Sequence, residues 1–190
     1  MAKLTAFTSY ADAQSNFSTE KLWELFDGNR EQLNISHECV DRHALQTQTQ
    51  TAVIVLRTDA PDEIISYAQL AKRSSQMAHF LTTRGIKPGD RVAIMLEPSL
   101  AFYACLFGIM KAGAIAVPLF TLFGPDGLNL RIADCLPSLL FTNAEKIGIV
   151  SAEYQPRTIL ADDGLMASLD QYPDTYLVTT QATDYAMYQY

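Results

Sequence analysis

The 190-residue sequence contains none of the short motifs that usually hold a nucleotide phosphate or activate a nucleophile. G-x-G-x-x-G, G-x-x-x-x-G-K-[ST] and G-x-S-x-G are all absent. Gly108 and Gly113 have the glycine spacing of a phosphate loop, but Ala-Ile follows them in place of a lysine and a hydroxyl. The histidines, at positions 37, 43 and 79, all precede the main strand–helix–strand unit, so no Ser-His-Asp set is predicted. We therefore assign no catalytic residue.

Positive charge is scarce, with 14 Lys and Arg against 21 Asp and Glu and a net charge of -7. Nucleic acids and anionic membrane surfaces attract proteins through basic patches, so neither is an expected partner. A membrane-spanning helix needs about 20 consecutive apolar residues. The strongest candidate, residues 100–120, is interrupted by Lys111, Gly113 and Pro118. We therefore expect no membrane span.

Cysteine is equally scarce, and Cys39, Cys105 and Cys135 form no C-x-x-C pair. Their spacing excludes the common zinc and dithiol motifs. An odd number of cysteines, two of them in apolar stretches, indicates reduced core thiols in a cytoplasmic protein. Residues 1–16 also lack the apolar block, about 7–15 residues long, that a signal peptide requires.

Residues 34–43 gather two histidines, a cysteine and two carboxylates, which raises the question of a metal site. On a helix, His37 and Asp41 share one face, whereas Cys39 and His43 share another that points about 200° away. The two pairs cannot converge on one ion without a further segment. We therefore predict an amphipathic helix with polar packing and no metal site.

The chain is organised around residues 90–120. Residues 91–96 and 114–119 are short apolar runs suited to buried strands, and the apolar block 100–110 between them is long enough for three helical turns. A strand, a wholly apolar helix and a second strand predict a βαβ unit with a parallel sheet.

Further elements flank this unit. Residues 51–57 read as a strand, and Ser66 with Gln69 forms a capping box at the start of a helix that ends near Arg84. We place Tyr67, Leu70, Ala71, Ser74, Met77, Ala78 and Leu81 on the inner face of that helix, and Gln69, Lys72, Arg73, Gln76 and Thr83 on the outer face.

Beyond residue 120, the pattern predicts a helix over 125–136, a strand over 138–142, a helix over 143–152 and a strand over 158–161. Together with the strand at 51–57, this alternation is typical of an α/β fold. We expect a doubly wound, mostly parallel sheet with helices on both faces. Residues 1–17 are assigned to an N-terminal arm and residues 18–190 to one α/β subdomain.

Three blocks resemble the N-terminal region of adenylate-forming, AMP-binding enzymes. They are Ile65-Ser-Tyr-Ala-Gln-Leu70, Gly85-Ile-Lys-Pro-Gly-Asp-Arg-Val92 and Leu106-Phe-Gly-Ile-Met-Lys-Ala-Gly-Ala-Ile-Ala-Val-Pro-Leu119. The stretch around residues 22–43 is similar to the short- and medium-chain acid–CoA ligase branch. The resemblance covers about residues 17–190, and the blocks follow the family order.

The resemblance implies that the full-length parent is an acid–CoA ligase that uses ATP, magnesium and coenzyme A, none of which is expected to bind tightly to this chain alone. In that family an acid and ATP give an acyl-AMP, from which coenzyme A displaces AMP. The phosphate loop, the acyl pocket and the catalytic lysine lie beyond the segment that residues 184–190 resemble. The resemblance therefore implies an N-terminal fragment that is inactive alone and whose partner is the missing C-terminal part of the same enzyme.

The resemblance also places two features near coenzyme A. The turn Thr121-Leu122-Phe123-Gly124 would lie beside the coenzyme A channel, and Lys146 lies where related ligases carry basic residues toward the nucleotide end of this cofactor. The residues alone also allow a simpler interpretation of both features. The turn can be an ordinary strand–helix connection, and Lys146 can be a solvated lysine.

A second hypothesis is a stand-alone, non-catalytic α/β binding or interaction module descended from such an enzyme. If a downstream half normally covers this region, its apolar surface is exposed or buried by self-association.

Overall fold

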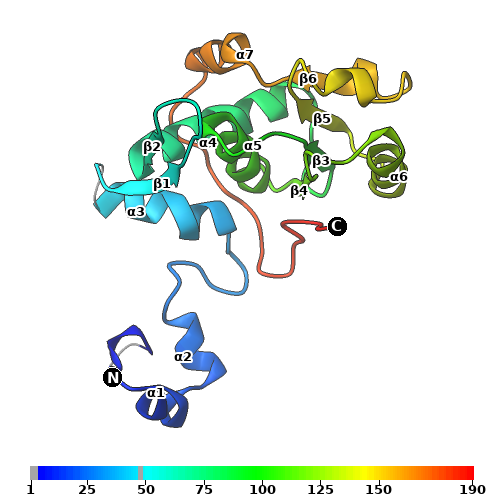
Figure 1. Cartoon of the computed structure of the whole chain (residues 1–190). Coiled ribbons are helices and arrows are strands. Elements are labelled where there is room, and N and C mark those ends of the chain that lie inside the picture. The colour runs from blue at the N-terminus through cyan, green and yellow to red at the C-terminus, as the bar shows by residue number, and fades with distance from the viewer. Residues whose placement is uncertain (1–3, 47–48) are drawn as a thin grey trace.

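The computed structural model describes residues 4–46 and 49–190, and its centre is a parallel four-stranded sheet (Figure 1). The strands are β3 (Arg91–Ile94), β4 (Ile115–Pro118), β5 (Leu139–Thr142) and β6 (Thr158–Leu160), in the order β4-β3-β5-β6. β3, β4 and β5 are mostly buried apolar runs, as expected for strands covered on both faces, whereas the edge strand β6 is partly exposed. The predicted α/β class and parallel sheet are confirmed.

Helices cover both faces of this sheet. Successive residues of each strand point to opposite sides, so an apolar strand has two faces to bury. Val92 and Ile94 pack with α4 (Tyr67–Thr83) and α5 (Leu100–Lys111). Ala93 packs on the opposite face with α6 (Pro125–Cys135). The predicted doubly wound arrangement is therefore present.

Helix α4 begins at the predicted capping box. Ser66 Oγ accepts a hydrogen bond from the backbone N–H of Gln69, and Gln69 Oε1 accepts one from the N–H of Ser66. One residue of the predicted outer face is misplaced, because Gln76 is fully buried. Its amide donates to Asp174 Oδ1 at 3.1 Å, so a later segment of the chain covers this side of the helix.

The strand at 51–57 does not join the parallel sheet, which corrects the predicted alternation. Instead β1 (Thr51–Val55) pairs antiparallel with β2 (Glu63–Ser66) in a separate two-stranded sheet. Val55 and Ile65 pack inward with Leu70 of α4. The apolar pair Ile64-Ile65 was too short to be recognised as a strand.

The predicted helix over 143–152 is also wrong. Asn143 does cap a turn, since its Oδ1 accepts from the N–H of Lys146 at 2.9 Å. Only the 3-10 turns η3 (Ile147–Ile149) and η4 (Gln155–Arg157) follow. Gly148 and the β-branched residues around it are weak helix formers, which explains why the cap does not propagate.

The N-terminal segment forms short helices that lie apart from the sheet in Figure 1. They are η1 (Leu4–Ala6), α1 (Tyr10–Asn16), which the sequence pattern did not predict, and α2 (Thr19–Trp23), which is capped by Ser18. A π-helical turn, η2 (His37–Asp41), then runs into α3 (Arg42–Gln46). Cys39 is exposed on this turn and is not the core thiol that we expected, whereas Cys105 and Cys135 are buried.

After α7 (Asp163–Ser168) and η5 (Leu169–Gln171), the chain returns along the molecule as an irregular strap, residues 172–190. The strap crosses α4 and ends beside the outer edge of β4. There the N–H of Ala116 donates to Ala186 O at 2.9 Å, and the N–H of Tyr188 donates to Ala116 O at 2.9 Å. This parallel bridge closes one edge of the sheet. In the described residues, no helix is long and apolar enough to cross a membrane.

A buried ammonium group links the helices on the α4 side of the sheet. Lys111, 1% exposed at the end of α5, donates to Asp41 Oδ1 at 2.7 Å and to the hydroxyls of Ser74 and Ser75 at 3.0 Å each. Burial lowers the pKa of Lys111 below its ordinary 10.5, and the Asp41 carboxylate opposes that shift. Asp41 thereby holds η2 against both α4 and α5.

Replacing Asp41 with Asn should cost about 3–5 kcal/mol of unfolding free energy at pH 7, because the Lys111 charge stays buried without its counter-ion. Lys111→Met should cost less, since the carboxylate that remains is 22% exposed. At pH 7 the Asp41→Asn variant should have a lower free energy of unfolding than the Lys111→Met variant. This difference should become smaller between pH 7 and 10. Because burial lowers the pKa of Lys111 in the folded state, the folded chain holds this proton less tightly than the unfolded chain as the pH rises.

Urea denaturation at both pH values checks this expectation. Asp170→Asn is the matched control, because Asp170 pairs with Arg73 at 2.7 Å but is 58% exposed. That surface change should cost less than about 1 kcal/mol. Equal losses for the two aspartate variants would contradict the role given to Asp41.

Candidate functional site

The largest hollow at the sheet is a groove of about 710 Å³ at the carboxyl ends of β3 and β4. In open parallel sheets, ligands bind outside these ends of the strands. Apolar and aromatic side chains supply most of its wall, and Glu97 and Arg131 supply its charged groups. The lining residues are Leu96, Glu97, Pro98, Phe102, Pro118, Leu119, Phe120, Thr121, Phe123, Arg131, Met187, Gln189 and Tyr190.

Some residues of the predicted turn 121–124 line the groove, and others lie at the surface. Thr121 and Phe123 line the groove, and Thr121 is buried. Leu122 is 74% exposed and is not among the lining residues. Gly124 is the N-cap of α6, in an extended backbone conformation that does not require glycine. The turn therefore brings two of its four side chains to one site.

Lys146 lies outside the groove. It follows β5, and its backbone N–H is held by Asn143 in the turn that replaces the predicted helix. The side chain is partly exposed. The carboxyl ends of β3 and β5 are nevertheless tied together, because Thr142 Oγ1 donates to Met95 O at 3.2 Å.

Two groove residues were missed by the sequence reasoning. Arg131 lies between the inward residues Leu128 and Ile132 of α6, a position that could have drawn attention as a basic residue within a buried helix face. Its guanidinium carbon lies 3.9 Å from the centre of the Phe123 ring and 5.8 Å from that of Tyr190. No sequence signal placed Tyr190 here, because the strap lacks a period.

Tyr190 is held to α6 by a short hydrogen bond. Its hydroxyl donates to Asp134 Oδ2 at 2.5 Å. Acceptance by this carboxylate raises the pKa of the Tyr190 phenol above its ordinary value of 10.0. The aromatic ring is thus fixed beside Arg131 although it is 48% exposed.

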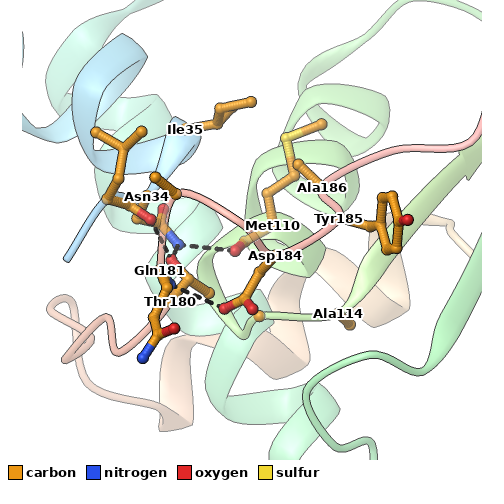
Figure 2. Close-up of a pocket in the computed structure, with 12 residues that line it drawn as sticks. Asn34, Ile35, Met110, Ala114, Thr180, Gln181, Asp184, Tyr185 and Ala186 are labelled. Carbon is orange, nitrogen blue, oxygen red and sulfur yellow. Dashed lines mark hydrogen bonds between the residues drawn. The ribbon is translucent and has the colours of Figure 1, made fainter. Parts of the chain in front are cut away.

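A second hollow, shown in Figure 2, lies where residues 33–35, the end of α5 and the strap meet. Its volume is about 80 Å³, too small for more than a few water molecules. Asn34 is buried here and donates through Nδ2 to Met110 O and to Thr180 Oγ1, both at 2.9 Å. We interpret this hollow as a structural junction.

The charged residues of η2 do not form a metal site. His37 Nε2 lies 3.5 Å from Asp27, and its Nδ1 lies 4.0 Å from Asp41 on the opposite side of the ring. Glu38 accepts instead from Arg42 and from the backbone N–H groups of residues 27 and 28. Over residues 4–46 and 49–190, no group of three His, Cys, Asp or Glu could hold a metal ion.

The chain is an α/β protein with an open parallel sheet, and its groove lies at the carboxyl edge where ligands bind in such folds. The family described as AMP-binding enzyme matches residues 40–190, and the chain belongs to this family. The resemblance drawn from the sequence blocks is therefore confirmed.

Curated relatives and solved structures agree. The chain is 39% identical over 119 residues to an acetyl-coenzyme A synthetase of Bradyrhizobium diazoefficiens, covering 60% of this chain and 18% of that protein. It is 34% identical over 151 residues to that of Halorhodospira halophila, covering 73% and 22%. An acyl-CoA synthetase from Brucella canis matches with a TM-score of 0.82 and 25% identity, over 96% of this chain and 36% of that one. The chain thus spans about a fifth of the length of the two curated relatives.

Replacing Asn34 with Ala should cost about 1–3 kcal/mol of unfolding free energy, because the carbonyl of Met110 and the N–H of His37 lose their partner in a buried junction. Asn16→Ala is the control, since Asn16 is exposed and bonds only within α1. Chemical denaturation measures both. A loss below about 0.5 kcal/mol for Asn34→Ala would show that the strap is held by other contacts.

Proposed function

We propose that residues 18–190, preceded by the arm 1–17, act as the N-terminal α/β subdomain of an ATP-dependent acid–CoA ligase. Such a ligase forms an acyl-AMP from a carboxylic acid and ATP, and coenzyme A then displaces AMP. Membership of the AMP-binding family over residues 40–190 carries this proposal. The names of the curated relatives, acetyl-coenzyme A synthetases, support coenzyme A as the acceptor.

The chain's own residues do not fit ATP and magnesium. Neither phosphate-loop motif occurs in the sequence, and the described residues hold no cluster of metal ligands. No chemical step is therefore assigned to these residues. We infer that the chain alone is inactive and that its partner is the remainder of a ligase polypeptide, because the matched segments make up only 18% and 22% of the two curated relatives.

The groove does fit part of coenzyme A. Thr121 offers a hydroxyl, Phe123 an aromatic wall and Arg131 a cation in a mostly apolar hollow of about 710 Å³. Leu122 and Gly124 would then shape the rim, and Lys146, beyond β5, would lie toward the nucleotide end. The role of this chain is to bind and orient coenzyme A.

We also place the protein in the cytoplasm, since its cysteines at positions 39, 105 and 135 are all unpaired.

The purified chain, given ATP, magnesium, coenzyme A and a panel of short- and medium-chain acids, should release no pyrophosphate above a control without protein. The full-length acetyl-coenzyme A synthetase of Halorhodospira halophila, given acetate, is the positive control. Acid-dependent turnover by residues 1–190 would overturn the inference that the chain is inactive alone.

One observation supports self-association of the chain through exposed apolar surface, which is expected of a subdomain that a downstream part normally covers. Ile54 and Ile64 are cross-strand partners on the outer face of the β1–β2 sheet and are 58% and 64% exposed, and the nearby Leu56 is 77% exposed. If this apolar face binds a second copy, the sedimentation coefficient should rise with protein concentration. Ile54→Thr combined with Ile64→Thr should abolish that rise while preserving strand propensity.

Leu177→Thr is the control for this experiment, because Leu177 is 83% exposed and belongs to the strap, not to the β1–β2 sheet. A chain that stays monomeric at all concentrations, or a Leu177→Thr variant as defective as the double variant, would count against this face.

A further inference from the structure

We propose that Arg131 is the phosphate-binding residue of the groove and that Tyr190 covers it until coenzyme A binds. The inference rests on the proposed function, since it takes coenzyme A as the ligand of the groove. It assigns a role to a residue that the sequence motifs did not indicate, and it adds a gate to the site.

The guanidinium of Arg131 is held in place but is not neutralised. One flat face stacks against Phe123 at 3.9 Å, and Nη1 donates to Gly127 O at 2.8 Å. In the part of the chain that the structure describes, no carboxylate lies within 4.0 Å of this side chain. Its Nε is buried and has no hydrogen-bond partner.

An unsatisfied buried donor is costly, and one on a cation that lines a groove requires an explanation. The Nε edge of a guanidinium forms a fork that matches the oxygens of a phosphate in two parallel hydrogen bonds. A phosphate that reached this edge would satisfy Nε and neutralise the charge together.

Charge in the groove directs an anion to this point. Glu97 and Arg131 are the charged residues of the lining. A phosphate is repelled by the first and attracted by the second, whereas the uncharged pantetheine arm of coenzyme A suits the aromatic and aliphatic wall.

Tyr190 supplies the cover. Its ring lies 5.8 Å from the guanidinium carbon, and its hydroxyl is tied to Asp134, three residues after Arg131 on α6. Because the ring is 48% exposed, loss of this one bond allows it to swing into solvent and uncover Nε.

Calorimetric titration of the 190-residue chain with coenzyme A and with pantetheine, which lacks the phosphates, tests the role of Arg131. Arg131→Gln should weaken coenzyme A binding about 10- to 100-fold and leave pantetheine binding unchanged. Arg131→Lys should recover only part of the loss, because it keeps the charge without the fork. Arg157→Gln removes the same charge from an exposed position on η4 and should bind coenzyme A like the unaltered chain.

Tyr190→Phe tests the gate, because it removes the bond to Asp134 and keeps the ring. This variant should bind coenzyme A about tenfold more tightly than the unaltered chain. Unchanged or weaker binding would overturn the gate. Melting temperatures of all variants establish that they are folded.

The outcomes separate the two proposals. Absence of coenzyme A binding by the unaltered chain would overturn both the groove assignment and this inference. Coenzyme A binding that Arg131→Gln leaves unchanged would overturn the inference alone and would leave the proposed ligase function standing.

Discussion

The ammonium group of Lys111 is the constraint on which the α4 side of the molecule depends. A buried charge costs several kcal/mol unless a counter-ion and hydrogen bonds compensate it. Here the compensating groups come from two other segments, a carboxylate of η2 and hydroxyls of α4. An apolar side chain would tolerate small shifts of these segments, whereas the charge requires all of them at fixed distances. The relative positions of η2, α4 and α5 follow from that requirement.

The parallel sheet determines where chemistry can occur. Alternate residues of β3 bury against α4 and α5 on one side and against α6 on the other, so both faces are closed to ligands. The strap closes the β4 edge through Ala116. The carboxyl ends of β3 and β4 remain open, and the turn after β4 delivers Thr121 and Phe123 there. Topology alone therefore places the groove, and the side chains of α6 and the strap give it its charge.

Short sequence signals predicted the elements that are stabilised by nearby residues. They did not predict structure that depends on contacts between residues far apart in the sequence. The capping box of Ser66 and Gln69 and the apolar runs of the βαβ unit carry their information within a few residues. The pairing of β1 with β2 does not, because Ile64-Ile65 becomes a strand only against its partner. Gln76 is buried by a segment almost 100 residues away. The same limit applies to the groove, where the turn at 121–124 was predicted and Tyr190, positioned by the strap, was not.

The groove and the buried charge are mechanically connected through the strap. Lys111 fixes the end of α5, the adjacent Met110 carbonyl accepts from Asn34, and Asn34 in turn holds Thr180. Thr180 is the point from which the strap continues to β4 and to Tyr190. About ten residues separate Thr180 from Tyr190, and the chain between them turns at residues 182–184 before it reaches β4. The Tyr190 ring is thus placed beside Arg131 by the course of the strap and by its hydrogen bond to Asp134, although no regular element carries it.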